Sequence, residues 1–128
     1  MKVLVIEDEP IYQLYLRKYL EKLGLNVFTC ETGMAGIQTA RRELPDFIIL
    51  DMGLPDMIGT DCLDMLKKDP DTAAIPVIVT TADATDEFKN ETLYLGAHVY
   101  HRKPITPDQL TFYVQKIRDV LEEEVGDH

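Results

Sequence analysis

Five residues with chemically useful side chains follow short apolar runs of the sequence. They are Glu7 and Asp8 after KVLVI, Asp51 after DFIIL, Thr81 after PVIVT, and Lys103 shortly after HVYH. Three carboxylates brought together would repel one another and raise one another's pKa values unless a cation intervened. Oxygen ligands of this kind suit Mg²⁺, which keeps several waters and takes one or two carboxylates together with phosphate oxygens. The residue types therefore predict a divalent-cation site with open positions.

The apolar runs are predicted to be β-strands that bring these residues to one place. Strands are expected over residues 2–6, 26–30, 46–50, 76–80 and 98–101, and helices near residues 10–23, 33–43, 58–68, 84–95 and 106–123. Alternating strands and helices indicate a parallel sheet with helices on both faces. Sites in such sheets form beyond the carboxyl ends of the strands. Asp51 therefore ends a buried run because the strand end is where the sheet meets the site.

Length and composition restrict the class of protein. The 128 residues predict a single domain over 1–128, with an ordered core over about 2–123. A formal net charge of −10 argues against direct nucleic-acid binding, because a phosphate backbone attracts Lys and Arg. No apolar run approaches the roughly 20 residues of a membrane helix. With no signal peptide after Met1, a soluble, cytoplasmic protein is expected.

Cys30 and Cys62 form no metal-binding pattern and are too few for a disulfide scaffold. The simplest interpretation is two small buried thiols in a reducing compartment.

Two helices carry apolar residues outside their core stripes. In the first helix, the core stripe is expected to contain Tyr12, Leu16, Tyr19, Leu20 and Leu23, while Leu14 projects opposite and Ile11 lies on the flank. In the last helix, the stripe is Leu110, Val114, Ile117 and Leu121, with Phe112 pointing away and Tyr113 at the edge. Such residues are either isolated exposed apolar side chains, which are common, or contacts for a partner.

The segments IEDEP, ILDMGLPDMIG, PVIVTTAD and VYHRKPI occur in order and at appropriate separations. Together they resemble the receiver domain of two-component response regulators, of the chemotaxis-receiver type, from Lys2 to about Leu121. The resemblance implies an α/β fold: a doubly wound (βα)5 flavodoxin-like sandwich with a five-stranded parallel sheet in the order 2-1-3-4-5. It also implies a signalling domain that catalyses its own phosphorylation and dephosphorylation without being a conventional enzyme.

The resemblance assigns the chemistry to particular residues. Asp51 is the implied phosphoacceptor, which attacks a phosphohistidine and becomes a 4-aspartylphosphate. Mg²⁺ is implied to be held by Asp8, Asp51 and the backbone carbonyl of Gly53, with Glu7 binding directly or through water. Mn²⁺ or Ca²⁺ can replace it in a crystal.

The phosphoryl group is implied to have three further partners. These are the Lys103 ammonium, the Thr81 hydroxyl and the Ala82 backbone N–H. The Lys103–Pro104 peptide bond is typically cis in the family, although cis is the minority state of such bonds.

Signal output follows the same resemblance. Thr81 and Tyr100 are the implied switch residues, and the switched surface consists of the fourth helix, fifth strand and fifth helix. Phe112 and Tyr113 are expected on that surface, with Phe88 a weaker candidate. Gly53 and Asp83 occupy positions that influence how long the phosphorylated state lasts.

Partners are expected at two places. A histidine kinase or histidine phosphotransfer protein is expected to dock on Ile11 and Leu14, and a downstream protein or fused output domain on the switched surface. The protein is expected to be a monomer or a phosphorylation-dependent dimer. It is either a stand-alone receiver or a fragment of a longer regulator or hybrid kinase.

Three alternatives remain in view. A phosphatase that forms a phosphoaspartate would need a second aspartate where this chain has Gly53. A phosphate-independent adaptor, or pseudo-receiver, would be favoured by missing acids or a missing lysine, and none is missing. A flavin carrier would need a phosphate-cradling Ser/Thr/Gly loop after the first strand, where this chain has acids.

Overall fold

The computed structural model describes residues 1–82 and 85–126, so Asp83 lies outside the described residues. Five parallel strands form one sheet in the order β2-β1-β3-β4-β5. The strands are β1 (Lys2–Ile6), β2 (Asn26–Cys30), β3 (Phe47–Asp51), β4 (Val77–Thr81) and β5 (Val99–Arg102). The helices are α1 (Pro10–Lys22), α2 (Gly33–Glu43), α3 (Gly59–Lys68), α4 (Asp86–Tyr94) and α5 (Pro107–Gly126). The predicted fold and strand order are confirmed.

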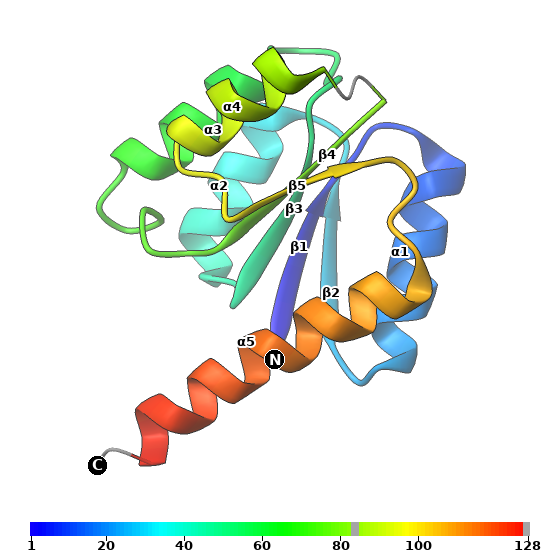
Figure 1. Ribbon diagram of the computed structural model, residues 1–128, viewed down its shortest axis with the longest axis vertical. Coiled ribbons are helices and arrows are strands. Elements are labelled where there is room, and N and C mark those ends of the chain that lie inside the picture. The colour runs from blue at the N-terminus through cyan, green and yellow to red at the C-terminus, as the bar shows by residue number, and fades with distance from the viewer. Residues whose placement is uncertain (83–84, 127–128) are drawn as a thin grey trace.

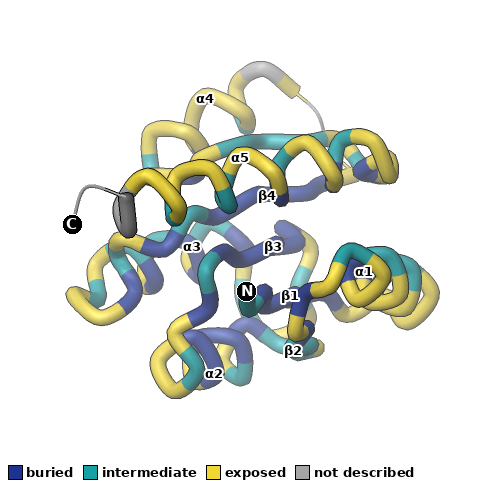
Figure 2. Tube along the Cα trace, turned by 90° about the horizontal axis from the view of Figure 1, so that it is seen from below, coloured by how far each residue is buried: buried dark blue, intermediate teal, exposed yellow. Residues whose placement is uncertain are grey.

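The helices form two layers around the sheet (Figure 1). Helices α1 and α5 cover one face, and α2, α3 and α4 cover the other. Strand β1 shows the reason, because Val3 and Val5 join one buried cluster while Leu4 and Ile6 join the other. Each such side chain contributes about 1.5–3 kcal/mol when fully buried. Figure 2 shows the buried strands between helices whose outer surfaces are exposed.

Local sequence signals set the helix ends. Pro10 is the first residue of α1, a position that needs no backbone N–H. Gly24 follows the end of α1 with a φ of 90°, which a residue with a side chain rarely adopts. The Thr32 hydroxyl accepts from the Ala35 N–H at 3.1 Å and caps α2. None of the described helices is long and apolar enough to cross a bilayer.

Several boundaries differ from the sequence prediction by a few residues. Strands β3, β4 and β5 each begin and end one residue later, because Asp51 still pairs with Thr80, and Thr81 with Arg102. Asp51 and Thr81 are thus the last residues of their strands rather than the first residues after them. Helix α5 continues to Gly126 instead of ending at 123, since no helix breaker interrupts it earlier.

The cysteines only partly match their prediction. Cys62 in α3 is buried, but Cys30 is half-buried. Cys30 ends β2, an edge strand that is covered by a neighbouring strand on one side only.

Gly59 allows the backbones of two segments to approach closely. A Cβ at this position would lie 2.4 Å from the Cα of Met52, the residue after Asp51. We expect Gly59→Ala to lower the free energy of unfolding by about 1–3 kcal/mol. The gain in helix propensity is only about 1 kcal/mol and does not offset this clash. Urea unfolding of both proteins measures the difference.

Gly53→Ala is the matched control. A Cβ there would meet only Asp51 Oδ2, at an ordinary 3.7 Å, and should change the free energy of unfolding by less than about 1 kcal/mol. Equal unfolding midpoints for Gly59→Ala and Gly53→Ala would contradict the steric argument.

Candidate functional site

The carboxyl ends of the strands open into a hollow of about 670 Å³. It is lined by Asp8, Glu9, Pro10, Asp51, Met52, Gly53, Thr81, Ala82, Phe88 and Lys103. Segments far apart in the sequence meet here because β1, β3 and β4 are neighbours in the sheet and β5 follows β4. The strand-end residues singled out from the sequence are therefore brought together.

Three acids form the centre of the hollow. Carboxylate oxygens of Glu7, Asp8 and Asp51 all lie within 4.8 Å of one another. Glu7 and Asp51 are buried, while Asp8 is exposed. An all-oxygen set of this kind matches the ligands that Mg²⁺ prefers, and the exposed Asp8 leaves the set open to solvent.

The Lys103 ammonium neutralises part of this negative charge. Its Nζ lies 2.6 Å from Glu7 Oε1, 3.2 Å from Asp51 Oδ1 and 3.9 Å from Glu9 Oε2. Burial alone would lower the pKa of Lys103, but the hydrogen bond to Glu7 and the charge of Asp51 outweigh it and raise the pKa above its usual value. Lys103 therefore stays charged between the two buried carboxyl groups.

The surroundings of Glu7 raise its pKa strongly. Burial, and then the neighbouring Asp51 carboxyl group, raise the pKa of Glu7 from 4.5 to about 8, against the opposing effect of Lys103. Among the described residues, Glu7 Oε2 finds no hydrogen-bond donor although it is buried. A buried carboxylate oxygen without a donor is suited to a cation, so the residues present fit a divalent metal ion.

The end of β4 and the residue after it carry the hydroxyl of Thr81 and the backbone amide of Ala82. Thr81 is buried at the end of β4, and its carbonyl accepts from the Lys103 N–H at 2.8 Å. Ala82 follows it at the exposed rim of the hollow. The Lys103–Pro104 peptide bond is cis, as the resemblance implied.

The segment after Asp51 is tied to α2 by a residue that the sequence analysis did not single out. Asp56 accepts hydrogen bonds from the Gly33 N–H at 2.8 Å and the Met34 N–H at 3.0 Å, which lower the pKa of its carboxyl group. Gly53 and Ile58 form an isolated antiparallel bridge within the same segment. An acid after a proline is a recognisable turn signal, but its partner helix lies more than 20 residues away in the chain.

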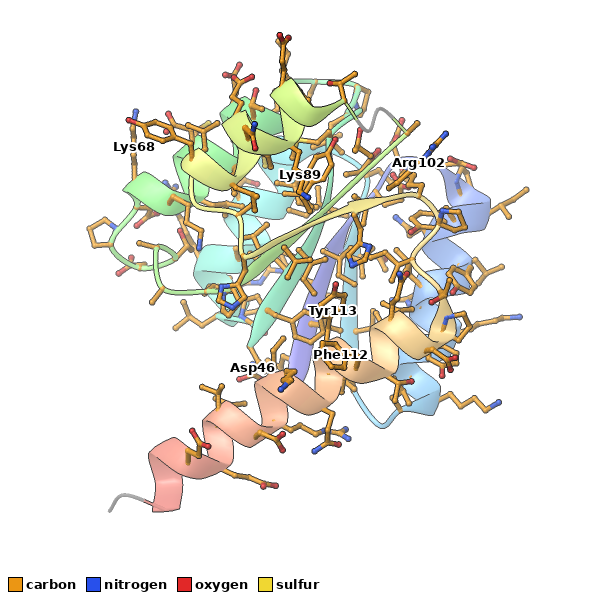
Figure 3. All side chains as sticks on the ribbon, in the orientation of Figure 1. Asp46, Lys68, Lys89, Arg102, Phe112 and Tyr113 are labelled. Atoms are coloured by element: carbon orange, nitrogen blue, oxygen red, sulfur yellow. The ribbon has the colours of Figure 1, made fainter. Side chains whose placement is uncertain are left out.

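The residues expected in switching occupy β5 and α5. Tyr100 is half-buried and packs edge-on against Phe88, with ring centroids 6.2 Å apart. Phe112 and Tyr113 project from α5 (Figure 3), and Phe112 is 57% exposed. Tyr113 is half-buried and hydrogen-bonds to His101 Nε2. These side chains lie on the elements to which the resemblance assigned them.

The residues expected to contact a kinase lie on α1. Ile11 is 82% exposed and Leu14 is 50% exposed. Pro10, which precedes them, lines the acidic hollow. The pair is exposed, as the helical pattern predicted, and it starts at the edge of the site.

A larger hollow of about 750 Å³ lies beside α5, and its lining includes Ile75, Val99, Ile117 and Leu121. It is mainly apolar, and among the described residues it gathers no group of acids that could hold a metal ion. The smaller hollow is the candidate site because the converging charges lie there.

Comparisons with known proteins identify related sequences. A family model described as the response regulator receiver domain matches residues 3–115. The chain is 34% identical over 109 residues to the protein PilH of Pseudomonas aeruginosa, covering 85% of this chain and 90% of PilH. It is 40% identical over 102 residues to the KDP operon transcriptional regulatory protein KdpE of Escherichia coli, covering 80% of this chain but only 44% of KdpE.

A solved structure adds a comparison at the level of the site. The receiver domain of sensor histidine kinase PA1611 from Pseudomonas aeruginosa is similar to this chain with a TM-score of 0.82 and 26% identity. The match covers 90% of this chain and 94% of that one, and that structure has a magnesium ion coordinated in its active site cleft.

The raised pKa of Glu7 predicts how stability depends on pH. The proton on folded Glu7 stabilises the protein fully below its unfolded pKa of 4.5, and this contribution is lost as the pH rises through about 8. Glu7→Gln is neutral and cannot lose that proton. From about pH 5 to pH 9, wild type should therefore lose at least about 1 kcal/mol of stability relative to the variant.

Urea unfolding across this pH range, with a chelator present, makes the measurement. Asp8→Asn controls for removing one acid from the same cluster. Parallel pH profiles for wild type and Glu7→Gln would contradict the assignment.

Proposed function

The chain belongs to the response regulator receiver domain family, and from this membership we propose that it accepts a phosphoryl group on Asp51 from a histidine kinase or histidine phosphotransfer protein. The observation that supports the proposal most strongly is the position of the Lys103 ammonium, 3.2 Å from Asp51 Oδ1 and 2.6 Å from Glu7 Oε1. A buried nucleophile beside a fixed positive charge is the arrangement that phosphoryl transfer requires.

The proposed step is an in-line displacement at phosphorus. An Asp51 carboxylate oxygen forms a bond to phosphorus while the phosphorus–nitrogen bond of the donor phosphohistidine breaks. The imidazole nitrogen keeps the electron pair of that bond, and Asp51 becomes an acyl phosphate. A carboxylate is a weak nucleophile, so the rate must come from positioning and charge neutralisation.

Several groups of the chain are placed to neutralise the phosphoryl charge. Mg²⁺, which we propose is held by Glu7, Asp8, Asp51 and the Gly53 carbonyl, supplies positive charge to the phosphoryl oxygens when bound. Lys103 pairs with one phosphoryl oxygen. The Thr81 hydroxyl and the Ala82 N–H donate to the others, and both residues line the same hollow.

Phosphorylation is proposed to alter the surface formed by α4, β5 and α5. The new group adds up to about two negative charges and strong hydrogen-bond acceptors. Thr81 moves toward it, which vacates space for Tyr100 to turn inward from its place beside Phe88. The changed surface, including Phe112 and Tyr113, then binds a downstream protein or a fused output domain.

The alternative proposal is a phosphate-independent adaptor that uses the same surface. Such an adaptor has no need for a lysine held between two buried acids. Burying these charges costs free energy that apolar side chains at the same positions would avoid. The contacts of Lys103 with Glu7 and Asp51 therefore favour the phosphoacceptor.

Asp51→Asn should abolish phosphorylation. The amide keeps the size of the side chain but removes the nucleophilic carboxylate. Purified protein is incubated with acetyl phosphate and Mg²⁺, and phosphate uptake is followed by intact-protein mass. Asp71→Asn, in the exposed turn between α3 and β4, is the matched control and should be phosphorylated like wild type. Wild-type uptake by Asp51→Asn would refute the assignment of Asp51.

Leu14→Asp should separate docking from chemistry. A charge in the middle of the exposed apolar patch on α1 should slow transfer from a phosphorylated histidine phosphotransfer domain by about tenfold or more. Phosphorylation by acetyl phosphate, which needs no protein docking, should be unchanged.

Leu44→Asp is the control, because Leu44 is similarly exposed at the end of α2. Undiminished transfer from the protein donor to Leu14→Asp would remove the support for this docking surface.

A further inference from the structure

Two tyrosines of α1 form hydrogen bonds with the backbone of Ile105, in the connection between β5 and α5. The Tyr12 hydroxyl accepts from the Ile105 N–H at 3.0 Å, and the Tyr15 hydroxyl donates to the Ile105 carbonyl at 2.7 Å. Both polar groups of this peptide position are therefore bound by side chains one helical turn apart. Ile105 itself is completely buried in the core beneath α1 and α5. Figure 1 shows the connection running alongside α1.

Tyr12 also contacts Lys103 directly. The Lys103 Nζ lies 4.9 Å from the centroid of the Tyr12 ring, within the range of a cation–π interaction. The rings of Tyr12 and Tyr15 lie 5.9 Å apart and support each other. Tyr12 thus holds the ammonium of Lys103 with its ring and the backbone two residues further along with its hydroxyl.

This support adds to the ion pairs of Lys103 with Glu7 and Asp51, which hold only the end of a long side chain. The residue follows the last residue of β5, and its side chain has four flexible carbon–carbon links. Its N–H bonds to the Thr81 carbonyl on one side. The hydrogen bonds of Tyr12 and Tyr15 to Ile105 hold the chain on the other side. The backbone of Lys103 is therefore held between β4 and α1.

We propose that Tyr12 and Tyr15 are positioning residues for Lys103: they fasten its loop to α1, and the Tyr12 ring holds its ammonium between Glu7 and Asp51. The inference rests on the proposed role of Lys103 in phosphoryl transfer. A displacement of about 1 Å in a group that must meet the transferred phosphoryl is enough to slow a reaction severely.

Four variants separate the contacts. Tyr12→Leu removes both the ring and the hydroxyl, Tyr12→Phe removes only the acceptor for Ile105, and Tyr15→Phe removes only the donor. Tyr19→Phe is the matched control, since the Tyr19 hydroxyl joins α1 to Thr111 of α5 at 2.9 Å and does not touch the loop.

Two readouts are taken for each variant. The first readout consists of two NMR measurements on metal-free protein. The chemical shift of the Lys103 Cε methylene reports the ring current of Tyr12, and hydrogen exchange of the Ile105 amide reports its hydrogen bond. The second is the rate of phosphorylation by acetyl phosphate with Mg²⁺.

Tyr12→Leu should lose the ring-current shift and be phosphorylated about tenfold more slowly. Tyr12→Phe should keep the ring-current shift but exchange the Ile105 amide faster. Tyr12→Phe and Tyr15→Phe should each be phosphorylated about threefold more slowly than wild type. Tyr19→Phe should match wild type in every readout.

An unchanged Lys103 signal in Tyr12→Leu, or equal slowing in Tyr19→Phe, would overturn the inference. If Tyr12→Leu does not fold, Ile105 exchange and rates in the two Phe variants decide instead, and wild-type values there would overturn it. If wild type takes up no phosphate, the proposed function fails, while the metal-free NMR measurements still decide whether Tyr12 holds Lys103.

Discussion

The site depends on one electrostatic constraint: two buried acids share a single ammonium. Glu7 follows β1, Asp51 ends the adjacent strand β3, and Lys103 reaches both from the far side of β4. Burial and the neighbouring Asp51 carboxyl group raise the pKa of Glu7 despite this ammonium, and Glu7 Oε2 has no hydrogen-bond donor among the described residues. Carboxylate oxygens gathered in this way are suited to a cation, and we propose that the cation in turn helps the hollow to receive a phosphoryl group.

The parallel sheet makes this arrangement possible. Because all five strands run in the same direction, their carboxyl ends meet at one edge, and the apolar faces pack against helices on both sides. The connections at that edge are then held by particular contacts. Asp56 ties the segment after Asp51 to α2, and the tyrosines of α1 hold the connection after Lys103. Core packing thus sets the position of the strands, and polar contacts set the position of the loops.

Much of the fold and the membership of the site could be predicted from the sequence. Unbroken apolar runs ending in Glu7, Asp51 and Thr81 indicate strands of a parallel sheet, whose geometry gathers those residues. Strand ends were misplaced by one residue because pairing between Asp51 and Thr80 depends on the neighbouring strand. The hydrogen bond between Tyr12 and Ile105 could not be predicted. The helical pattern indicates that Tyr12 faces the core, but it does not indicate which group its hydroxyl binds.

The decisive measurement is a crystal structure of the protein grown with Mg²⁺ and beryllofluoride. We expect beryllium bonded to an Asp51 oxygen, Mg²⁺ contacting carboxylates of the Glu7, Asp8 and Asp51 cluster, and the Lys103 ammonium hydrogen-bonded to a fluorine. An adduct elsewhere, or an Asp51 adduct that leaves Lys103 bound only to Glu7, would contradict it.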